Sequence, residues 1–119
     1  MNKREIGARY EERASVYLEQ QGYRIIEKNY RCRIGEIDLI AEDREYLVFV
    51  EVKYRSGTVY GQGLEHVDRR KQQVIGKVAA YYFTAHRFSD RLCRFDIVSI
   101  DGAGDILHFE NAFELTPRL

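Results

Sequence analysis

Apolar side chains recur at three- and four-residue steps in two stretches of the chain. Over residues 3–21 the recurring positions are Ile6, Tyr10, Ala14, Tyr17 and Leu18, and Gly22 follows directly. Over residues 64–85 they are Val67, Val74, Val78, Tyr81 and Tyr82. Because residues three or four apart share one face of an α-helix, this spacing predicts two amphipathic helices, the first of which ends at the glycine.

Five shorter runs are rich in β-branched and aromatic residues and predict strands. They cover residues 23–30, 36–41, 46–55, 95–100 and 106–109. The polar run 42–45 joins the second and third strands as a hairpin, residues 56–63 contain three glycines and predict a loop, and residues 101–105 have the glycines of a turn. The order αβββαββ predicts an α/β fold, with one domain over residues 1–119 and a mixed five-stranded sheet flanked by helices.

Composition limits the class of protein. A chain of 119 residues, 45% of them hydrophobic, is long enough to bury one core. Nineteen Lys and Arg residues balance 19 Asp and Glu residues. A net charge of zero disfavours a general nucleic-acid coat protein, whose affinity depends on a large positive surplus, so any nucleic-acid contact must come from a local patch. No apolar run approaches the ~20 residues that cross a bilayer.

The two cysteines predict no metal site. Cys32 and Cys93 do not form a CxxC pair and have no histidine at metal-ligand spacing. The first residues also lack the charged and apolar regions of a secretory signal. We therefore expect free, reduced thiols in a cytoplasmic protein.

The predicted hairpin brings charged residues together. If Arg44 and Glu45 form a two-residue loop, Asp38 lies across from Glu51. Lys53 then lies two residues further along the same strand, on the face of Glu51. A longer loop or a bulge is an alternative, because Arg44-Glu45 is not a typical hairpin turn. A slip of one residue would move Asp38 to the other face and separate the group.

Asp38, Glu51 and Lys53 have the chemistry of a metal-assisted hydrolase. Hard cations such as Mg²⁺ or Mn²⁺ take carboxylate oxygens as ligands. Such an ion polarises a phosphodiester, and a lysine nearby can position the attacking water or offset developing charge. We interpret Asp38, Glu51 and Lys53 as catalytic, with the two carboxylates also binding the metal.

An ordinary strand with one solvated face is the alternative, because Glu-x-Lys alternation is common in antiparallel sheets. Two features of the sequence argue against it. Leu47 and Phe49 share the face of Glu51, so that face begins apolar and becomes charged. Asp38 is flanked by apolar residues on both sides. A carboxylate in such surroundings needs a partner.

Further residues are candidates for the same site. Glu11 falls on the apolar stripe of the first helix and is a candidate third carboxylate, although its head could instead reach water. Arg31, Arg33, Arg55 and Lys71 are candidate nucleic-acid contacts around the site, and they would recognise backbone phosphates rather than bases. For Arg69 and Arg70, a solvated helix surface is the simpler interpretation.

The remaining polar and aromatic side chains predict no separate site. His66, His86 and His108 do not share a face at short spacing, so we expect packing or surface roles and no zinc site. Tyr54, Tyr60, Tyr81 and Tyr82 could stack on bases, but packing in the core and at its rim is the simpler explanation.

The charged hairpin is part of a longer pattern. Asp38 followed by Glu51-Val52-Lys53 resembles the signature of the PD-(D/E)xK nuclease superfamily. Across most of the chain the sequence resembles the UPF0102 family. The segments that carry this second resemblance are Glu11-x-x-Ala14, Gly22-Tyr23, Asn29-Tyr30-Arg31, Gly35 to Ile40, Phe49 to Lys53, Phe95-Asp96 and Asn111-Ala112-Phe113.

The resemblance implies a restriction-endonuclease-like fold, close to that of archaeal Holliday-junction resolvases, and a nuclease activity on DNA, including branched or structured DNA. By this resemblance Glu11, Asp38, Glu51 and the Val52 backbone carbonyl would bind Mg²⁺ or Mn²⁺, and Lys53 would assist catalysis. Resolvases are often two-fold dimers, so a homodimer is a candidate assembly. A non-catalytic nucleic-acid-binding module acting with a partner, and an interaction protein unrelated to nucleic acid, are the alternatives.

Overall fold

A computed structural model describes residues 2–55 and 68–114 of the chain. Its elements, in order, are α1 (Lys3–Gln20), β1 (Arg24–Arg31), β2 (Glu36–Asp43), β3 (Tyr46–Arg55), α2 (Arg69–Ala85), β4 (Leu92–Asp101) and β5 (Ile106–Phe109). This order confirms the predicted αβββαββ arrangement of an α/β domain.

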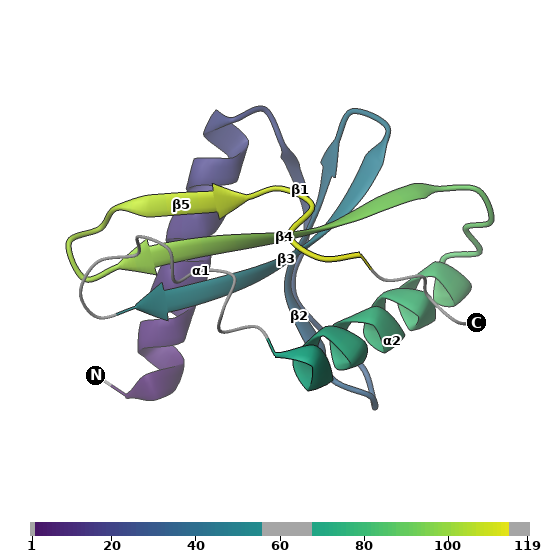
Figure 1. Ribbon diagram of the computed structural model, residues 1–119, viewed down its shortest axis with the longest axis horizontal. Helices are drawn as coiled ribbons and strands as arrows, with labels where there is room; N and C mark the ends of the chain where they lie inside the picture. The colour runs from purple at the N-terminus through teal and green to yellow at the C-terminus, as the bar shows by residue number, and fades with distance from the viewer. Residues whose placement is uncertain (1, 56–67, 115–119) are drawn as a thin grey trace.

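The five strands form one sheet in the spatial order β1-β2-β3-β4-β5 (Figure 1). Three of the neighbouring pairs are antiparallel, and β3 and β4 are parallel. Parallel neighbours need a crossover connection, which contains α2 in this fold. The sheet is therefore mixed, as predicted.

One helix covers each face of the sheet, and the alternation of side chains along β3 explains why. Leu47 and Phe49 pack in a cluster with α2, whereas Val48 and Val50 pack in a cluster with α1. Successive strand residues point to opposite faces, so a strand that is buried on both sides is almost continuously apolar. Figure 1 shows α1 behind the sheet and α2 in front of it.

The predicted hairpin register is confirmed. Leu39 pairs with Val50 and Asp43 with Tyr46, which leaves Arg44 and Glu45 as the two-residue turn. Arg44 has a φ of 57°, in the left-handed region that tight hairpin turns require of a loop residue.

The second helix differs from the prediction. It was expected from residue 64, but it begins at Arg69, because the side chain of Asp68 caps it and accepts a hydrogen bond of 2.8 Å from the Lys71 amide. The expected loop 56–63 and residues 64–67, including Val67, lie outside the described residues. Tyr81 is 49% exposed and not part of the buried stripe. That stripe consists of Ile75, Val78, Ala79, Tyr82 and Phe83.

Strand β4 is longer than the predicted 95–100. It pairs with β3 from Leu92 to Asp101, residue for residue with Tyr46 to Arg55. Within the described ranges, neither helix has the length and apolar character needed to cross a lipid bilayer.

Gly35 lets the β1–β2 connection pass close to α2. A Cβ atom at this position would lie 2.7 Å from Cγ1 of Val74 and 3.5 Å from Cγ2 of Val78. Valine is stiff in a helix, so Val74 cannot easily turn away. The glycine thus allows the start of β2, which leads to Asp38, to approach α2.

We expect Gly35→Ala to lower the free energy of unfolding by about 1–3 kcal/mol, because the added methyl group overpacks the contact with Val74. Urea denaturation measures the change. Gly7→Ala is the matched control, since a Cβ at Gly7 would meet nothing within 4 Å, and alanine in a helix should stabilise by up to about 1 kcal/mol. Equal stability of Gly35→Ala and the natural chain would contradict the close approach.

Candidate active site

The β2–β3 ladder ends where the three predicted catalytic residues meet. At the end of the ladder farthest from the hairpin turn, the last pair is Leu39 with Val50. Beyond it, the backbone N–H of Val52 donates to Oδ2 of Asp38 at 2.8 Å. The carbonyl and N–H of one strand residue point to the same side of the strand, so the Val52 carbonyl also points towards the side where Asp38 lies.

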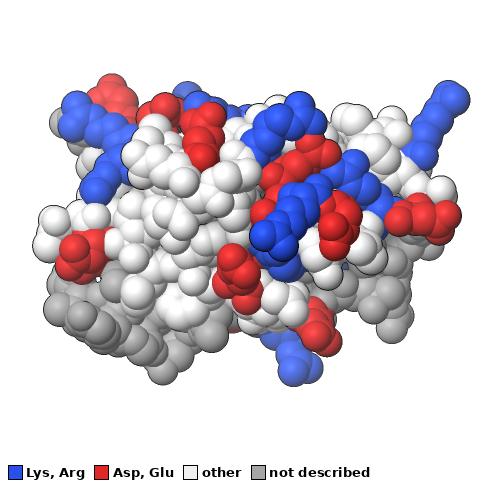
Figure 2. Space-filling model, turned by 90° about the horizontal axis from the view of Figure 1, so that it is seen from above, with Lys and Arg blue, Asp and Glu red and all other residues white. Residues whose placement is uncertain are grey.

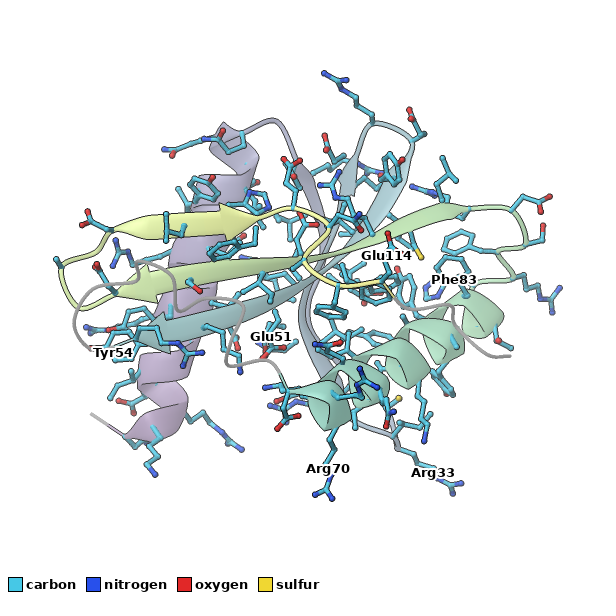
Figure 3. All side chains as sticks on the ribbon, viewed as in Figure 1. Arg33, Glu51, Tyr54, Arg70, Phe83 and Glu114 are labelled. Atoms are coloured by element: carbon cyan, nitrogen blue, oxygen red, sulfur yellow. The ribbon has the colours of Figure 1, made fainter. Side chains whose placement is uncertain are left out.

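Glu51 is the most buried member of the group, with 6% of its surface exposed. Its Oε1 lies 2.6 Å from Nζ of Lys71 and 3.5 Å from Nζ of Lys53. A buried carboxylate is costly unless it is paired, and these two ammonium groups provide the pairing. Figure 3 shows Glu51 at the point where β3 passes the beginning of α2.

Asp38 has a strongly raised pKa. Burial is the largest cause, and together with the negative charges of Glu51 and Glu11 it raises the pKa of Asp38 to about 7. The hydrogen bond from Val52 and the charge of Lys71 act in the opposite direction. Near neutral pH the site therefore holds a carboxyl group that changes charge easily, as is common in functional sites.

The two lysines respond to the shared carboxylate in opposite ways. Burial lowers the pKa of Lys53, Lys71 lowers it further, and Glu51 only partly offsets both. Burial also acts to lower the pKa of Lys71, but its hydrogen bond to Glu51 and the attraction of that charge outweigh burial, so its pKa is raised. Glu51 thus pairs mainly with Lys71.

Glu11 does not complete a three-carboxylate site in this conformation. Its charge acts on Asp38 from α1. Among residues 2–55 and 68–114, however, no three His, Cys, Asp or Glu side chains lie close enough to hold one ion. The arrangement brings Asp38 and Glu51 together and leaves Glu11 at its edge.

The predicted basic contacts fall into different environments. Arg31 is exposed and forms an ion pair of 2.9 Å with Glu36. Arg33 and Arg70 extend from the same side of the molecule, one from the β1–β2 connection and one from α2 (Figure 3). Lys71 reaches Glu51 directly, and Arg55 is partly buried. On the face seen in Figure 2, basic and acidic side chains lie next to one another and form no continuous basic surface in the described part.

The tyrosine and histidine side chains singled out from the sequence mostly contact other rings. Tyr54 is 43% exposed and stacks on Tyr10, with ring centroids 4.3 Å apart. His86 lies 3.9 Å from the ring of Tyr82, again between centroids. His66 lies outside the described residues.

A second polar cluster, which sequence reasoning missed, lies on the other face of the sheet. Asp96 is fully buried. Its two carboxylate oxygens accept hydrogen bonds from Arg94, at 2.9 and 3.0 Å, and from the Asn111 amide at 3.0 Å, and Nε2 of His108 lies 2.8 Å away. The Tyr23 hydroxyl contacts Asp96 at 3.4 Å. Only the alternation of Arg94 and Asp96 was visible in the sequence, because the other partners come from distant segments.

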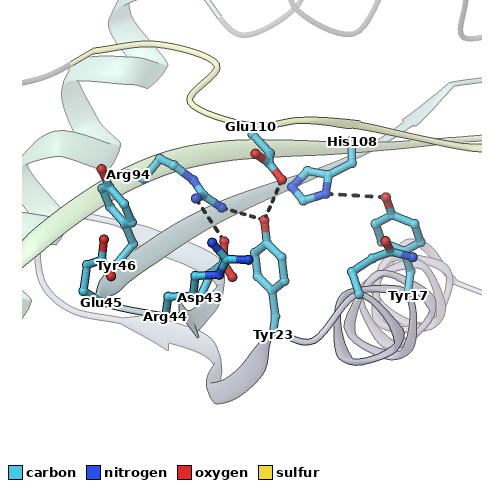
Figure 4. A pocket seen from close by; sticks show the side chains of 10 residues that line it. Tyr17, Tyr23, Asp43, Arg44, Glu45, Tyr46, Arg94, His108 and Glu110 are labelled. Atoms are coloured by element: carbon cyan, nitrogen blue, oxygen red, sulfur yellow. Dashed lines mark hydrogen bonds and ion pairs between the residues drawn. The ribbon is translucent and has the colours of Figure 1, made fainter.

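Three members of this cluster, Tyr23, Arg94 and His108, line a pocket of about 630 Å³ (Figure 4). The Tyr23 hydroxyl joins Arg94 and Glu110, and Nδ1 of His108 lies 3.5 Å from the Tyr17 hydroxyl. Burial opposes ionisation of Asp96, but the hydrogen bonds from His108, Arg94 and Asn111 outweigh it and lower the pKa. The charged groups around Asp96 are paired with one another by hydrogen bonds. The geometry is therefore that of a structural network, unlike the neighbouring carboxylates of Asp38 and Glu51.

Comparison with known proteins shows a family that this chain resembles. The model of a family described as "Uncharacterised protein family UPF0102" matches residues 10–100. A UPF0102 protein of Fusobacterium nucleatum is 45% identical over 86% of each chain. Relatives from Lachnoclostridium phytofermentans and Persephonella marina, also described as UPF0102 proteins, are 44% and 43% identical over more than nine-tenths of both chains. None of these descriptions states an activity.

We expect Asp38→Asn to stabilise the protein at alkaline pH. The folded chain holds the Asp38 proton more tightly than the unfolded chain, so stability falls as pH rises from about 4 to about 7. Asparagine removes this loss and can still accept the Val52 hydrogen bond. The gain should be about 1–3 kcal/mol at pH 8 and close to zero near pH 4.

Urea denaturation at both pH values measures this difference. Glu36→Gln is the control, because Glu36 lies on the same strand with its side chain 50% exposed. A gain of the same size at both pH values would show that ionisation of Asp38 is not its cause.

We expect Asp96→Asn to lower the free energy of unfolding by about 2–4 kcal/mol, because it removes the buried counter-charge of Arg94 and leaves only the partly exposed Asp43 to pair with it. Chemical denaturation near neutral pH measures the loss. Asp105→Asn, at an exposed position in the β4–β5 turn, should change stability by less than about 0.5 kcal/mol. A similarly small loss for Asp96→Asn would contradict the assignment of the cluster as a structural network.

Proposed function

This chain belongs to the uncharacterised protein family UPF0102, and from that premise we propose that it is a metal-dependent nuclease that hydrolyses phosphodiester bonds in DNA, including branched or otherwise structured DNA. One observation carries the proposal. Asp38, Glu51 and Lys53 lie together where the β2–β3 ladder opens. Their order along the chain resembles the PD-(D/E)xK nuclease signature, and the mixed sheet between two helices agrees with that superfamily and with resolvases.

The donor set fits a hard divalent cation. Two carboxylates lie side by side in a mostly buried position, and their repulsion contributes to the raised pKa of Asp38. A cation between them would relieve this repulsion. Asp38, Glu51 and the Val52 carbonyl would hold Mg²⁺ or Mn²⁺, with water completing the shell, and Glu11 would contribute only after a change in its side-chain position. A bound ion of this kind would polarise the phosphodiester and favour attack by water.

The lysines have separate tasks in this proposal. Lys53 lies beside Glu51 on β3, so its ammonium group would meet the phosphate that approaches the carboxylates and offset charge that develops there. Lys71 comes from the first turn of α2 and occupies Oε1 of Glu51. If a metal ion bound that oxygen, Lys71 would be free to contact the nucleic acid. Arg31 and Arg33 would then contact neighbouring phosphates, which agrees with affinity from a local patch.

A cytoplasmic location agrees with this function, since Cys32 and Cys93 are both free thiols.

The alternative function is a nucleic-acid-binding module that does not cut. The pairing of Glu51 with two lysines favours this alternative, because the acidic group is already neutralised without metal.

The test is cleavage of four-way junction, duplex and single-stranded DNA by the purified protein with Mn²⁺ or Mg²⁺. We expect cleavage of at least one of these substrates, and a loss of about 100-fold or more in Asp38→Asn, Glu51→Gln and Lys53→Met, because each removes a group that acts on the phosphate or its metal. Glu36→Gln, on the same strand but outside the site, should cut normally. Equal cleavage by all variants would show that another site or another protein is responsible.

Metal binding separates the nuclease from the non-cutting module. Calorimetry with Mn²⁺ should show binding that Glu51→Gln abolishes. Lys71→Met should bind Mn²⁺ more tightly than the natural chain, because it removes the cation that competes for Glu51. Absence of Mn²⁺ binding in the presence of DNA, for both the natural chain and Lys71→Met, would favour the non-cutting module.

A further inference from the structure

Three buried hydrogen-bonding groups near Lys53 have no hydrogen-bond partner among the described residues. One is the hydroxyl of Ser99, a residue that is fully buried. The other two are Nε and Nη2 of Arg55, a residue that is partly buried. Buried donors without partners are rare in folded proteins and destabilise them, so each such group calls for an explanation.

The strand register brings these groups to one face. Lys53 pairs with Ser99 and Arg55 with Asp101 in the parallel β3–β4 ladder. The rings of Phe49 and Phe95, an earlier pair in the same ladder, stack with centroids 5.6 Å apart. Alternate residues share a face, so Lys53, Arg55 and Ser99 all project to the side on which Glu51 lies.

The nearest acidic residue does not neutralise Arg55. Asp101 lies directly across from it, but Oδ1 of Asp101 accepts hydrogen bonds from the amides of Ala103 and Asp105, at 2.9 and 2.8 Å, and holds the β4–β5 turn. No ion pair joins Arg55 to Asp101 in the described part of the chain. Nε and Nη2 of Arg55 therefore remain unpaired donors on the face of the sheet that carries Glu51.

We propose that Arg55 and Ser99 form an anion-binding subsite that takes a backbone phosphate next to the one at Glu51. The guanidinium offers parallel N–H donors that match two phosphate oxygens, and the serine hydroxyl adds a third donor. Arg55 lies about 6.6 Å beyond Lys53 along β3, at the usual rise of a strand. This inference rests on the proposed function, because the ligand is a phosphate of the same nucleic acid.

The ligand assignment also explains why a buried serine is tolerated at position 99. A hydroxyl without a partner destabilises the folded chain, and an apolar residue of similar size would remove that penalty. A serine kept for ligand binding therefore predicts an unusual combination. Ser99→Ala should weaken phosphate binding without lowering the thermal midpoint.

The test is fluorescence anisotropy with a labelled single-stranded DNA oligonucleotide in EDTA, so that affinity is measured without metal or cleavage. We expect Arg55→Gln to weaken binding about tenfold and to reduce the slope of log affinity against log salt by about one, the change for one lost phosphate contact. Ser99→Ala should weaken binding about threefold, with an unchanged or raised thermal midpoint. Arg55→Lys should keep the salt slope but lose part of the affinity, since the ammonium group lacks the planar fork.

Arg24→Gln is the matched control for loss of one positive charge. Arg24 is an exposed arginine on β1 that pairs with Glu42, near the opposite end of β2 from Asp38. It should change affinity by less than about twofold if the Arg55 effect is local. Affinities of Arg55→Gln and Ser99→Ala equal to that of the natural chain would overturn the subsite. A lowered thermal midpoint of Ser99→Ala with unchanged affinity would overturn it as well.

The two proposals fail in different ways. If no metal supports cleavage, but oligonucleotide binding still depends on Arg55 and Ser99, the nuclease proposal fails and the subsite remains. If cleavage depends on Asp38 and Glu51, but Arg55→Gln and Ser99→Ala bind the oligonucleotide normally, the subsite alone fails.

Discussion

The pairing of Leu39 with Val50 sets how Asp38 meets Glu51 at the candidate site. This register ends the β2–β3 ladder just before Asp38, whose carboxylate then accepts a hydrogen bond from the Val52 amide, next to Glu51. A slip of one residue would separate Asp38 from Glu51 and Val52. The turn at Arg44 and Glu45 holds the register at one end, and the close approach of Gly35 to α2 supports the other. The site thus depends on packing well outside it.

Among the described residues, the acidic groups at Asp96 and at Asp38 with Glu51 have opposite electrostatic character. Asp96 is surrounded by donors, and its pKa is lowered. Asp38 lies beside other carboxylates, and its pKa is raised to about 7. A buried charge that is fully paired stabilises a particular arrangement of segments, whereas an unbalanced group tends to mark a binding or catalytic site. This contrast favours Asp38 and Glu51, and not the pocket beside Asp96, as the place of the candidate chemistry.

A neutral chain can still receive a polyanion when its cations are concentrated near the site. Lys53 and Lys71 both contact Glu51, and Arg55 lies next along β3. These cations come from a strand and from the first turn of a helix that are separated in sequence. Their positive charge partly neutralises the acidic group, so the proposed site would not strongly repel a phosphate before a metal ion binds.

The sequence by itself determined the element order, the hairpin register and the proximity of Asp38, Glu51 and Lys53. These features follow from local periodicity and from the fixed alternation of a strand, which are written in neighbouring residues. The predicted start of α2 was wrong, because Asp68, which caps the helix, is one of several polar residues in a row and does not stand out as a cap in the sequence. Only the tertiary structure decided that Lys71 pairs with Glu51, that Glu11 stays at the edge, and that Ser99 lies beside Lys53. The physical reason is that each of these contacts joins segments distant in the chain, whose approach depends on how the helices and the parallel strands pack.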